Sequence, residues 1–184
     1  MRRTGIIEIT CPELVATIGC AQDKRHAHDV WNHSMACLDA CDPDPILRVA
    51  ALLHDIGKPK VHAFSADSQE PTFFDHQRIG AEMAEEISTR LRFSNDERAH
   101  ITALVRHHVI RYDDGWTDGD VRRWIRGVGV PLLEDLFRLA IADLHGKGVD
   151  ASEKIAEIER LRERTNRLLA AGTPLSAKDL VLRG

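Results

Sequence analysis

Residues 50–59 read Ala50-Ala51-Leu52-Leu53-His54-Asp55-Ile56-Gly57-Lys58-Pro59 and place a histidine beside an aspartate at the end of an apolar run. Apolar residues recur at helical spacing from Pro45 onward, which predicts a helix that carries His54 and Asp55 and ends at Gly57-Lys58-Pro59. A single histidine against an apolar stripe is more often a core residue than a metal ligand. Whether His54 and Asp55 bind a metal therefore depends on the other ionisable residues of the chain.

The sequence on both sides of this stretch has mostly helical periodicity. Asp29 should cap a helix that begins at Val30 and ends at Asp42-Pro43-Asp44. Between residues 60 and 75 the pattern changes to short apolar runs around a polar, turn-rich segment, which predicts a small β-hairpin or an ordered loop. The fold class is therefore all-α, and we expect one domain over residues 1–184. Further helices are expected over about 12–19, 76–91, 95–110, 118–127, 131–146 and 151–171.

The composition limits the function. The chain has 184 residues, and 43% of them are hydrophobic, which is enough for one domain with a buried core. Its 25 basic and 29 acidic residues give a net charge of −4, which excludes coating of nucleic acid through bulk charge, and no DNA-reading motif is present. No apolar run reaches the roughly 18 to 20 residues of a membrane span, so we expect no membrane partner and a cytoplasmic protein. The 10 histidines outnumber the 5 Phe, 3 Trp and 1 Tyr together.

Ionisable residues at predicted helix ends and on apolar helix faces form one set: His33, His54, Asp55, His76, His107, His108 and Asp143. Asp143 has apolar neighbours along its helix, and a buried ionised carboxylate is unfavourable unless it is paired or binds a metal. Neutral imidazoles with carboxylates suit Mn, Fe, Ni, Co or Zn, and a set without thiolate argues against a structural zinc site. The pattern predicts a catalytic metal site.

In these residues the sequence resembles the HD superfamily of metal-dependent phosphohydrolases, whose pattern is a histidine, then His-Asp, then a distant aspartate. His33, His54, Asp55 and Asp143 match it in order and type, which implies that they hold a first metal ion. Over residues 4–184 the chain is more closely similar to the HD domain of bacterial tRNA nucleotidyltransferases and poly(A) polymerases. That similarity implies an HD-domain helical bundle. It is carried by Thr4-Gly5-Ile6-Ile7, Asp29-Val30-Trp31-Asn32-His33-Ser34, Phe74-Asp75-His76, Val105-Arg106-His107-His108 and Pro174-Leu175-Ser176-Ala177-Lys178-Asp179-Leu180.

The nucleotidyltransferase head of those enzymes has no match in the chain. The head carries a glycine turn and paired aspartates, whereas Asp42-Pro43-Asp44 is a helix-breaking loop without that glycine context. We therefore expect no CCA addition, and either a free-standing HD protein or an excised fragment.

The resemblance also implies a second metal ion. Superfamily members that add a histidine after the hairpin and another near a His-His pair hold two ions, and His76 with either His107 or His108 matches those additions. Adjacent residues on a helix point about 100° apart, so one ion rarely takes both, and His108 is preferred. Asp55 would bridge the ions as the catalytic carboxylate. Two divalent ions (Mn, Ni, Co, Fe or Zn, with Mg also compatible) would lower the pKa of a shared water and give a hydroxide nucleophile.

Substrate contacts are expected from residues near this set. Lys58 lies where its ammonium could reach a phosphate oxygen as an added electrophile, although a solvated lysine at a helix end is an equally consistent interpretation. Arg111 could clamp a phosphate, with Tyr112 as a stacking surface. By the resemblance, His26 lies at the mouth of the site.

The leading hypothesis is a metal-dependent phosphohydrolase that acts on phosphomonoesters or phosphodiesters of nucleotides or RNA ends. The resemblance narrows the substrate to 2′,3′-cyclic phosphates and 2′-phosphates. Three alternatives remain open: a mononuclear 5′-nucleotidase, a di-iron HD oxygenase and a non-catalytic RNA-binding module. The sequence leaves the oligomeric state open.

Overall fold

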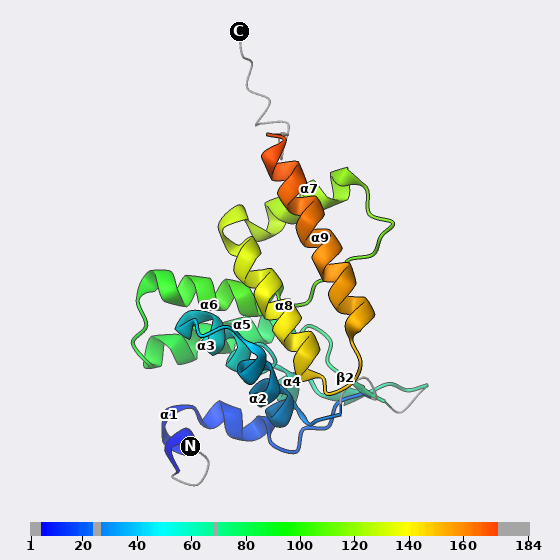
Figure 1. Cartoon of the computed structure of the whole chain (residues 1–184). Coiled ribbons are helices and arrows are strands. Elements are labelled where there is room, and N and C mark those ends of the chain that lie inside the picture. Colours follow the sequence, from blue (N-terminus) through cyan, green and yellow to red (C-terminus); the bar gives the residue numbers. More distant parts are fainter. Residues whose placement is uncertain (1–4, 24–26, 68–69, 173–184) are drawn as a thin grey trace.

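The computed structural model describes residues 5–23, 27–67 and 70–172, and within these ranges the chain is a helical bundle with one small hairpin (Figure 1). The all-α class and the hairpin are as predicted. The elements in chain order are α1 (Ile6–Thr10), the 3₁₀ helix η2 (Pro12–Thr17), α2 (Val30–Ala40), α3 (Pro45–Leu53), α4 (Lys58–Val61), β1 (Ala63–Phe64), β2 (Pro71–Thr72), α5 (His76–Arg90), α6 (Asn95–His107), α7 (Asp118–Val128), the 3₁₀ helix η3 (Val130–Leu132), α8 (Leu133–Gly146) and α9 (Ser152–Ala170).

Polar side chains set the starts of several helices. Asp29 accepts a hydrogen bond from the backbone N–H of Asn32 (2.8 Å) at the start of α2, as predicted, and Asp44 caps α3 in the same way. Ser94 and Thr117 form capping boxes at the starts of α6 and α7. These caps fix where the helices begin, and so where the residues at their far ends lie.

The helix that carries the His-Asp pair is shorter than predicted. It ends at Leu53, and His54 and Asp55 lie in a tight turn that is closed by backbone hydrogen bonds between residues three apart. Gly57, in the same turn, packs directly on α5, because a Cβ there would lie 2.3 Å from the carbonyl oxygen of His76. The turn therefore holds the His-Asp pair against the start of α5.

Helix α8 connects the two halves of the bundle. Helices α5 and α6 lie side by side and α6 packs on α3, whereas α7 and α9 lie toward the other end of α8 (Figure 1). Leu136 and Leu139 of α8 belong to a core cluster with α2, α3 and α6, and Phe137 belongs to a second one with α7 and α9. The packing of α8 on α2 brings Asp143 next to His33.

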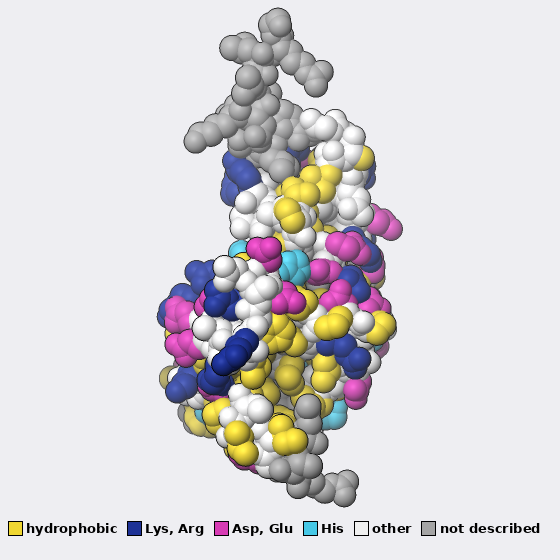
Figure 2. Space-filling model, turned by 90° about the vertical axis from the view of Figure 1, so that its left-hand side faces the viewer, with side chains coloured by type: hydrophobic (Ala, Val, Ile, Leu, Met, Phe, Trp, Pro, Cys, Tyr) yellow, Lys and Arg dark blue, Asp and Glu magenta, His cyan; other side chains and the backbone are white. Residues whose placement is uncertain are grey.

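In the described ranges, no helix has both the length and the apolar character needed to cross a membrane. Figure 2 shows basic and acidic side chains interspersed over the face that it presents. That pattern agrees with the small net charge of −4 and gives no broad basic surface on this face.

Candidate metal centre

The first group of chemically active side chains is the His33 cluster, which we define as His33, His54 and Asp143. The Nε2 atom of His33 lies 2.9 Å from Asp143 Oδ1 and 3.1 Å from His54 Nε2. The His54 Nε2 atom lies 3.6 Å from the same Asp143 oxygen. Helix α2, the turn after α3 and helix α8 thus aim one ligand-type atom each at a common point.

The second group is the His76 cluster, which we define as Asp55, His76 and His108. The two Nε2 atoms of His76 and His108 lie 3.3 Å apart. They lie 3.4 Å and 3.6 Å, respectively, from Asp55 Oδ1. His76 is the first residue of α5 and His108 follows the last residue of α6, so the antiparallel packing of these helices makes the pair.

Asp55 joins the two clusters. Its Oδ1 faces His76 and His108, whereas its Oδ2 lies 3.2 Å from His54 Nε2 and 3.5 Å from His33 Nε2. Asp55 is only 2% exposed. One carboxylate therefore presents a different oxygen to each cluster.

The same type of local hydrogen bond orients three histidine rings, those of His54, His76 and His108. Each donates its Nδ1–H to the backbone carbonyl three residues earlier, at 2.7 Å, 2.8 Å and 2.7 Å. A carbonyl only accepts hydrogen bonds, so Nδ1 carries the proton and, in the neutral ring, Nε2 keeps its lone pair toward the cluster.

This arrangement fits a bound cation. In the neutral His76 and His108 rings, two Nε2 lone pairs face each other at 3.3 Å, a contact that no hydrogen bond between the rings relieves. An ion that both nitrogens ligate relieves it, with Asp55 supplying negative charge. Imidazole and carboxylate donors without thiolate suit Mn, Fe, Co, Ni or Zn. The donors of each cluster are therefore of a kind that could hold a divalent ion.

Burial and the carboxylates have opposite effects on the pKa values here. Burial lowers the pKa of His54, but Asp55 and Asp143 outweigh it and raise that pKa to about 10. In His76 burial prevails over Asp55 and lowers the pKa to about 4. Burial also raises the pKa of Asp55, but the neighbouring His54 and Lys58 hold it well below its ordinary value. The Asp55 carboxylate is therefore ionised, as a metal ligand must be.

Lys58 lies inside the site. Its Nζ donates hydrogen bonds to Asp55 Oδ2 (2.6 Å) and to Gln22 Oε1 (2.5 Å), and the residue is 7% exposed. The ring of Phe73 lies 5.3 Å from the same ammonium. The interpretation of Lys58 as a solvated helix-end lysine does not match this position.

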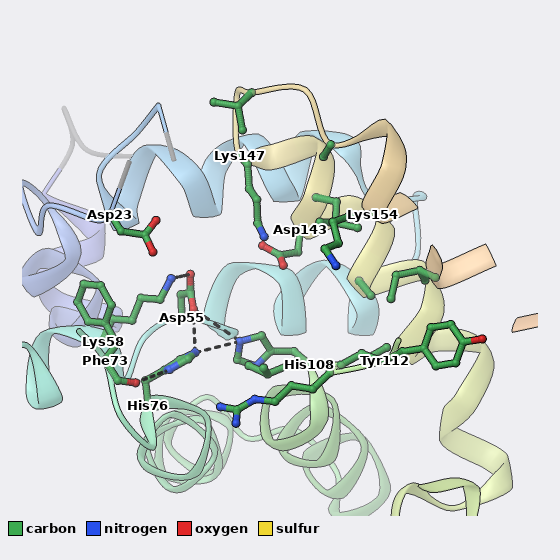
Figure 3. A pocket seen from close by; sticks show the side chains of 18 of the residues that line it. Asp23, Asp55, Lys58, Phe73, His76, His108, Tyr112, Asp143, Lys147 and Lys154 are labelled. Carbon is green, nitrogen blue, oxygen red and sulfur yellow. Dashed lines mark hydrogen bonds and ion pairs between the residues drawn. The ribbon is translucent and has the colours of Figure 1, made fainter. Parts of the chain in front are cut away.

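A cavity of about 880 Å³ opens over the clusters (Figure 3). Asp55, His76, His108 and Asp143 line one part of it, and Lys58 is a further lining residue. The side chain of Asp143 is 20% exposed because it faces this space. A substrate can therefore reach both clusters from one opening.

The other residues singled out from the sequence are placed as follows. Arg111 is exposed and lines the cavity. His107 is half-buried and belongs to neither cluster, whereas the adjacent His108 belongs to the His76 cluster. Tyr112 is buried against Trp116 in the core, which leaves little of its ring for stacking. His26 lies outside the described residues.

Sequence reasoning missed the lysines on the far side of the cavity. Lys147 and Lys154 both line it, and Figure 3 shows them pointing toward Asp143 from the side opposite His76 and His108. A signal for Lys147 was available, because it follows Asp143 by four residues and so lies on the same face of α8. No pattern marked Lys154, which lies in a different helix.

The chain is thus a helical bundle with two histidine–aspartate clusters that Asp55 connects. This combination is typical of a metal-binding domain. The chain belongs to the HD domain family, whose model matches residues 25–144. The matched range contains all the residues of both clusters.

Among curated proteins, the chain is similar to two tRNA nucleotidyltransferases and to a Multifunctional CCA protein. It is 34% identical over 155 residues to the A-adding tRNA nucleotidyltransferase of Deinococcus radiodurans, a match that covers 81% of this chain and 35% of that protein. It is 32% identical over 159 residues to the CC-adding tRNA nucleotidyltransferase of Thermus thermophilus, with coverage of 82% and 35%. The Multifunctional CCA protein of Teredinibacter turnerae is 31% identical over 117 residues, with coverage of 59% and 27%. The chain thus spans about a third of the length of these relatives or less.

Proposed function

We propose that this HD domain is a metal-dependent phosphohydrolase that cleaves phosphomonoesters or phosphodiesters of nucleotides or RNA ends, of the 2′,3′-cyclic phosphate and 2′-phosphate type. The observation that carries the proposal is the shared carboxylate of Asp55 between two clusters at an accessible cavity. The names of the relatives, which act on tRNA, support an RNA end as the source of the phosphate.

The two clusters would hold one divalent ion each. His33, His54 and Asp143 would hold the first ion, His76 and His108 the second, and Asp55 would contact both. Such ions supply an acidified water molecule at neutral pH and neutralise charge on the phosphoryl oxygens. Two ions, and Asp55 and Lys58 as catalytic residues, are parts of this proposal.

The side chains of the protein would position the substrate. The Lys58 ammonium is fixed between Asp55 and Gln22, so it can donate a hydrogen bond to a phosphoryl oxygen without first losing rotamer freedom. The Phe73 ring beside it keeps water from one side of the ammonium. Arg111, at the same cavity, would bind a phosphate through its guanidinium.

The direct test is hydrolysis by the protein loaded with Mn, Ni or Co. We expect turnover of bis-p-nitrophenyl phosphate or of 2′,3′-cyclic AMP, together with two metal ions per chain by elemental analysis. No turnover of either compound with metal bound would contradict the phosphodiesterase proposal. One ion per chain with intact His76 and His108 would contradict the two-ion assignment and favour a mononuclear nucleotidase.

A further inference from the structure

The cavity is much larger than a phosphate needs. Its volume of about 880 Å³ lies in the upper range for sites that enclose a whole small-molecule ligand, roughly 300 to 1,000 Å³. Beyond the clusters, the lining includes the apolar residues Ile110, Leu144 and Ile158, together with Phe74 and Val149. A substrate that fills it has a sizeable apolar or planar group beside the reacting phosphate.

Two cations that line this space have no hydrogen-bond or ion-pair partner among the residues that the structure describes. The ammonium of Lys58 is paired with Asp55, and that of Lys154 is 2.6 Å from Glu157. The side chains of Arg111 and Lys147, in contrast, form no hydrogen bond or ion pair with any residue in the part of the chain that the structure describes. Many other arginines of the bundle are paired, for example with Glu or Asp at Arg78, Arg90 and Arg138. Arg111 and Lys147, unpaired within the described ranges, can therefore bind an anion.

Arg111 and Lys147 also flank the clusters at short sequence separation. Arg111 follows His108 by three residues in the segment after α6, and Lys147 follows Asp143 by four residues at the end of α8. Figure 3 shows Lys147 pointing into the cavity toward Asp143, from a different side than Lys58 and Phe73. Lys147 and Lys58 therefore offer two separate positions for an anion in the cavity.

The rim carries an aromatic ring with little protein cover. Phe74 is 88% exposed although it lines the cavity, and Val149 is 44% exposed. A nucleobase is planar and apolar on its faces, so it can stack on such a ring whatever its identity. The cavity therefore offers a phosphate position at the clusters, a stacking surface on Phe74 at the rim and a second position for an anion.

We propose that the cavity takes nucleotides with two phosphates: the reacting one at the clusters and a second one, one nucleoside away, on Arg111 and Lys147, with the base against Phe74. The inference rests on the proposed function and narrows its substrate class. Two compounds carry this chemistry, a nucleoside 3′,5′-bisphosphate and the terminal linkage of an oligoribonucleotide.

The test is equilibrium binding of three ligands to the metal-loaded protein by calorimetry: uridine 3′-phosphate, uridine 3′,5′-bisphosphate and the dinucleotide UpU with a 3′-phosphate. We expect one or both ligands with a second phosphate to bind about tenfold more tightly than uridine 3′-phosphate, since charge-assisted hydrogen bonds are strong. A gain with the dinucleotide alone identifies an RNA chain as the source, and a gain with the bisphosphate alone identifies a free nucleotide. Equal affinity for all three would overturn the inference.

Variants separate the two positions. Lys147→Gln should reduce the tenfold gain to about twofold or less, whereas Phe74→Ala should weaken all three ligands by a similar factor. Lys60→Gln is the matched control, because Lys60 is exposed in α4 and does not line the cavity. Circular dichroism and metal content verify that each variant is folded. A gain that survives Lys147→Gln and Arg111→Gln contradicts the second phosphate position.

The proposed function can fail separately. A binding gain that depends on Lys147, without hydrolysis of any phosphoester, keeps the two-phosphate inference and rejects the phosphohydrolase proposal. Hydrolysis of uridine 2′,3′-cyclic phosphate and of its 5′-phosphorylated form at the same kcat/KM, with no binding gain, keeps the phosphohydrolase proposal. That result rejects the two-phosphate inference.

Discussion

His54, His76 and His108 each lie three residues beyond a carbonyl that accepts the Nδ1–H of the same ring. The backbone therefore sets the tautomer and the direction of Nε2 in three rings, without a dedicated polar side chain. Because the carbonyls belong to helix ends or tight turns, the rings are oriented before any ligand arrives.

The choice between two adjacent histidines can be tested directly. His108→Ala should weaken binding of one metal ion by about 10- to 100-fold or more, because the ring belongs to the His76 cluster. His107→Ala should leave the metal content at the wild-type value, since His107 belongs to neither cluster. Elemental analysis after dialysis measures both, and the opposite result would move the ligand role to His107.

The shared carboxylate makes the strongest prediction for a single residue. Asp55→Asn removes the negative charge that faces both clusters, so kcat on a phosphodiester should fall by about 100-fold or more. Asp39→Asn is the control, because Asp39 is exposed on α2. A variant Asp55→Asn with near wild-type kcat and two bound ions would refute the bridging role.

The sequence predicted which residues of the site to consider, but not all of their positions. It marked His54 and Asp55 through their helix-end position, and it preferred His108 over His107 without a signal for which of the two rings faces the site. That choice depends on where α6 ends, and the helix stops at His107, earlier than the predicted residue 110. Metal binding by the cluster residues remains a prediction. Substrate binding by Lys58 and Arg111 also remains a prediction.

At the scale of elements, close backbone approaches align the helices that carry the clusters. Gly57 contacts the start of α5, and Gly146 contacts α2, where a Cβ would lie 2.8 Å from the backbone nitrogen of Cys37. Neither glycine has a positive φ angle, so it is the absence of a side chain that matters here. The first contact places His76 beside Asp55, and the second places Asp143 beside His33.

Gly57→Ala should therefore damage the site as well as the fold. The added methyl group would displace the backbone of α5, and we expect a loss of about 1 to 3 kcal/mol in the free energy of unfolding, with weaker metal binding at the His76 cluster. Gly80→Ala is the matched comparison, because the nearest atoms to its Cβ would lie at 3.4 Å. Urea denaturation and metal titration would measure the difference, and equal effects of the two substitutions would contradict this explanation.

The start of α6 gives a prediction that depends on pH. Ser94→Ala removes the N-cap of the helix that ends beside His108 and should cost about 1 kcal/mol of stability, whereas Ser94→Asp should retain most of it. Hydrogen bonds from the side chain and the backbone of Ser94 hold the pKa of Glu97 below its ordinary value. The contribution of Glu97 is therefore present above about pH 4.5 and is lost as the pH falls through the lowered pKa. Urea midpoints at pH 7 and pH 3 should show a larger effect of Ser94→Ala at pH 7.

Most element boundaries were predictable because periodicity and caps act locally. The helices expected over 76–91 and 151–171 are observed over His76–Arg90 and Ser152–Ala170. The segment expected to be helical from residue 131 instead begins with the 3₁₀ helix Val130–Leu132 before α8. The early end of α3 reflects packing of Gly57 on α5, a tertiary contact that no local pattern contains.

At the scale of the molecule, bound metal should stabilise the fold. The clusters draw on α2, α5 and α8 and on the residues that follow α3 and α6, so an unfolded chain cannot form them. At a free metal concentration 100 times its Kd, one ion adds about 2.7 kcal/mol of stability. This corresponds to a rise in Tm of roughly 5 to 10 °C for a chain of this size. Thermal melts with and without Mn should show it, and Asp55→Asn should lose it.

The all-α bundle could be predicted from the sequence, whereas the shape of the cavity could not. The cavity combines residues of the hairpin, the segment after α6 and the loop between α8 and α9, and their mutual positions arise only from packing. A single domain over residues 1–184 and a cytoplasmic location remain predictions.

The hairpin of β1 and β2 divides each cluster. His33 and His54 precede it and Asp143 follows it, while Asp55 precedes it and His76 and His108 follow it. A chain cut at this hairpin would yield two fragments, and neither would contain a complete cluster. Reassociation of the fragments should therefore be metal-dependent, so the domain lends itself to a split reporter whose complementation senses divalent ions.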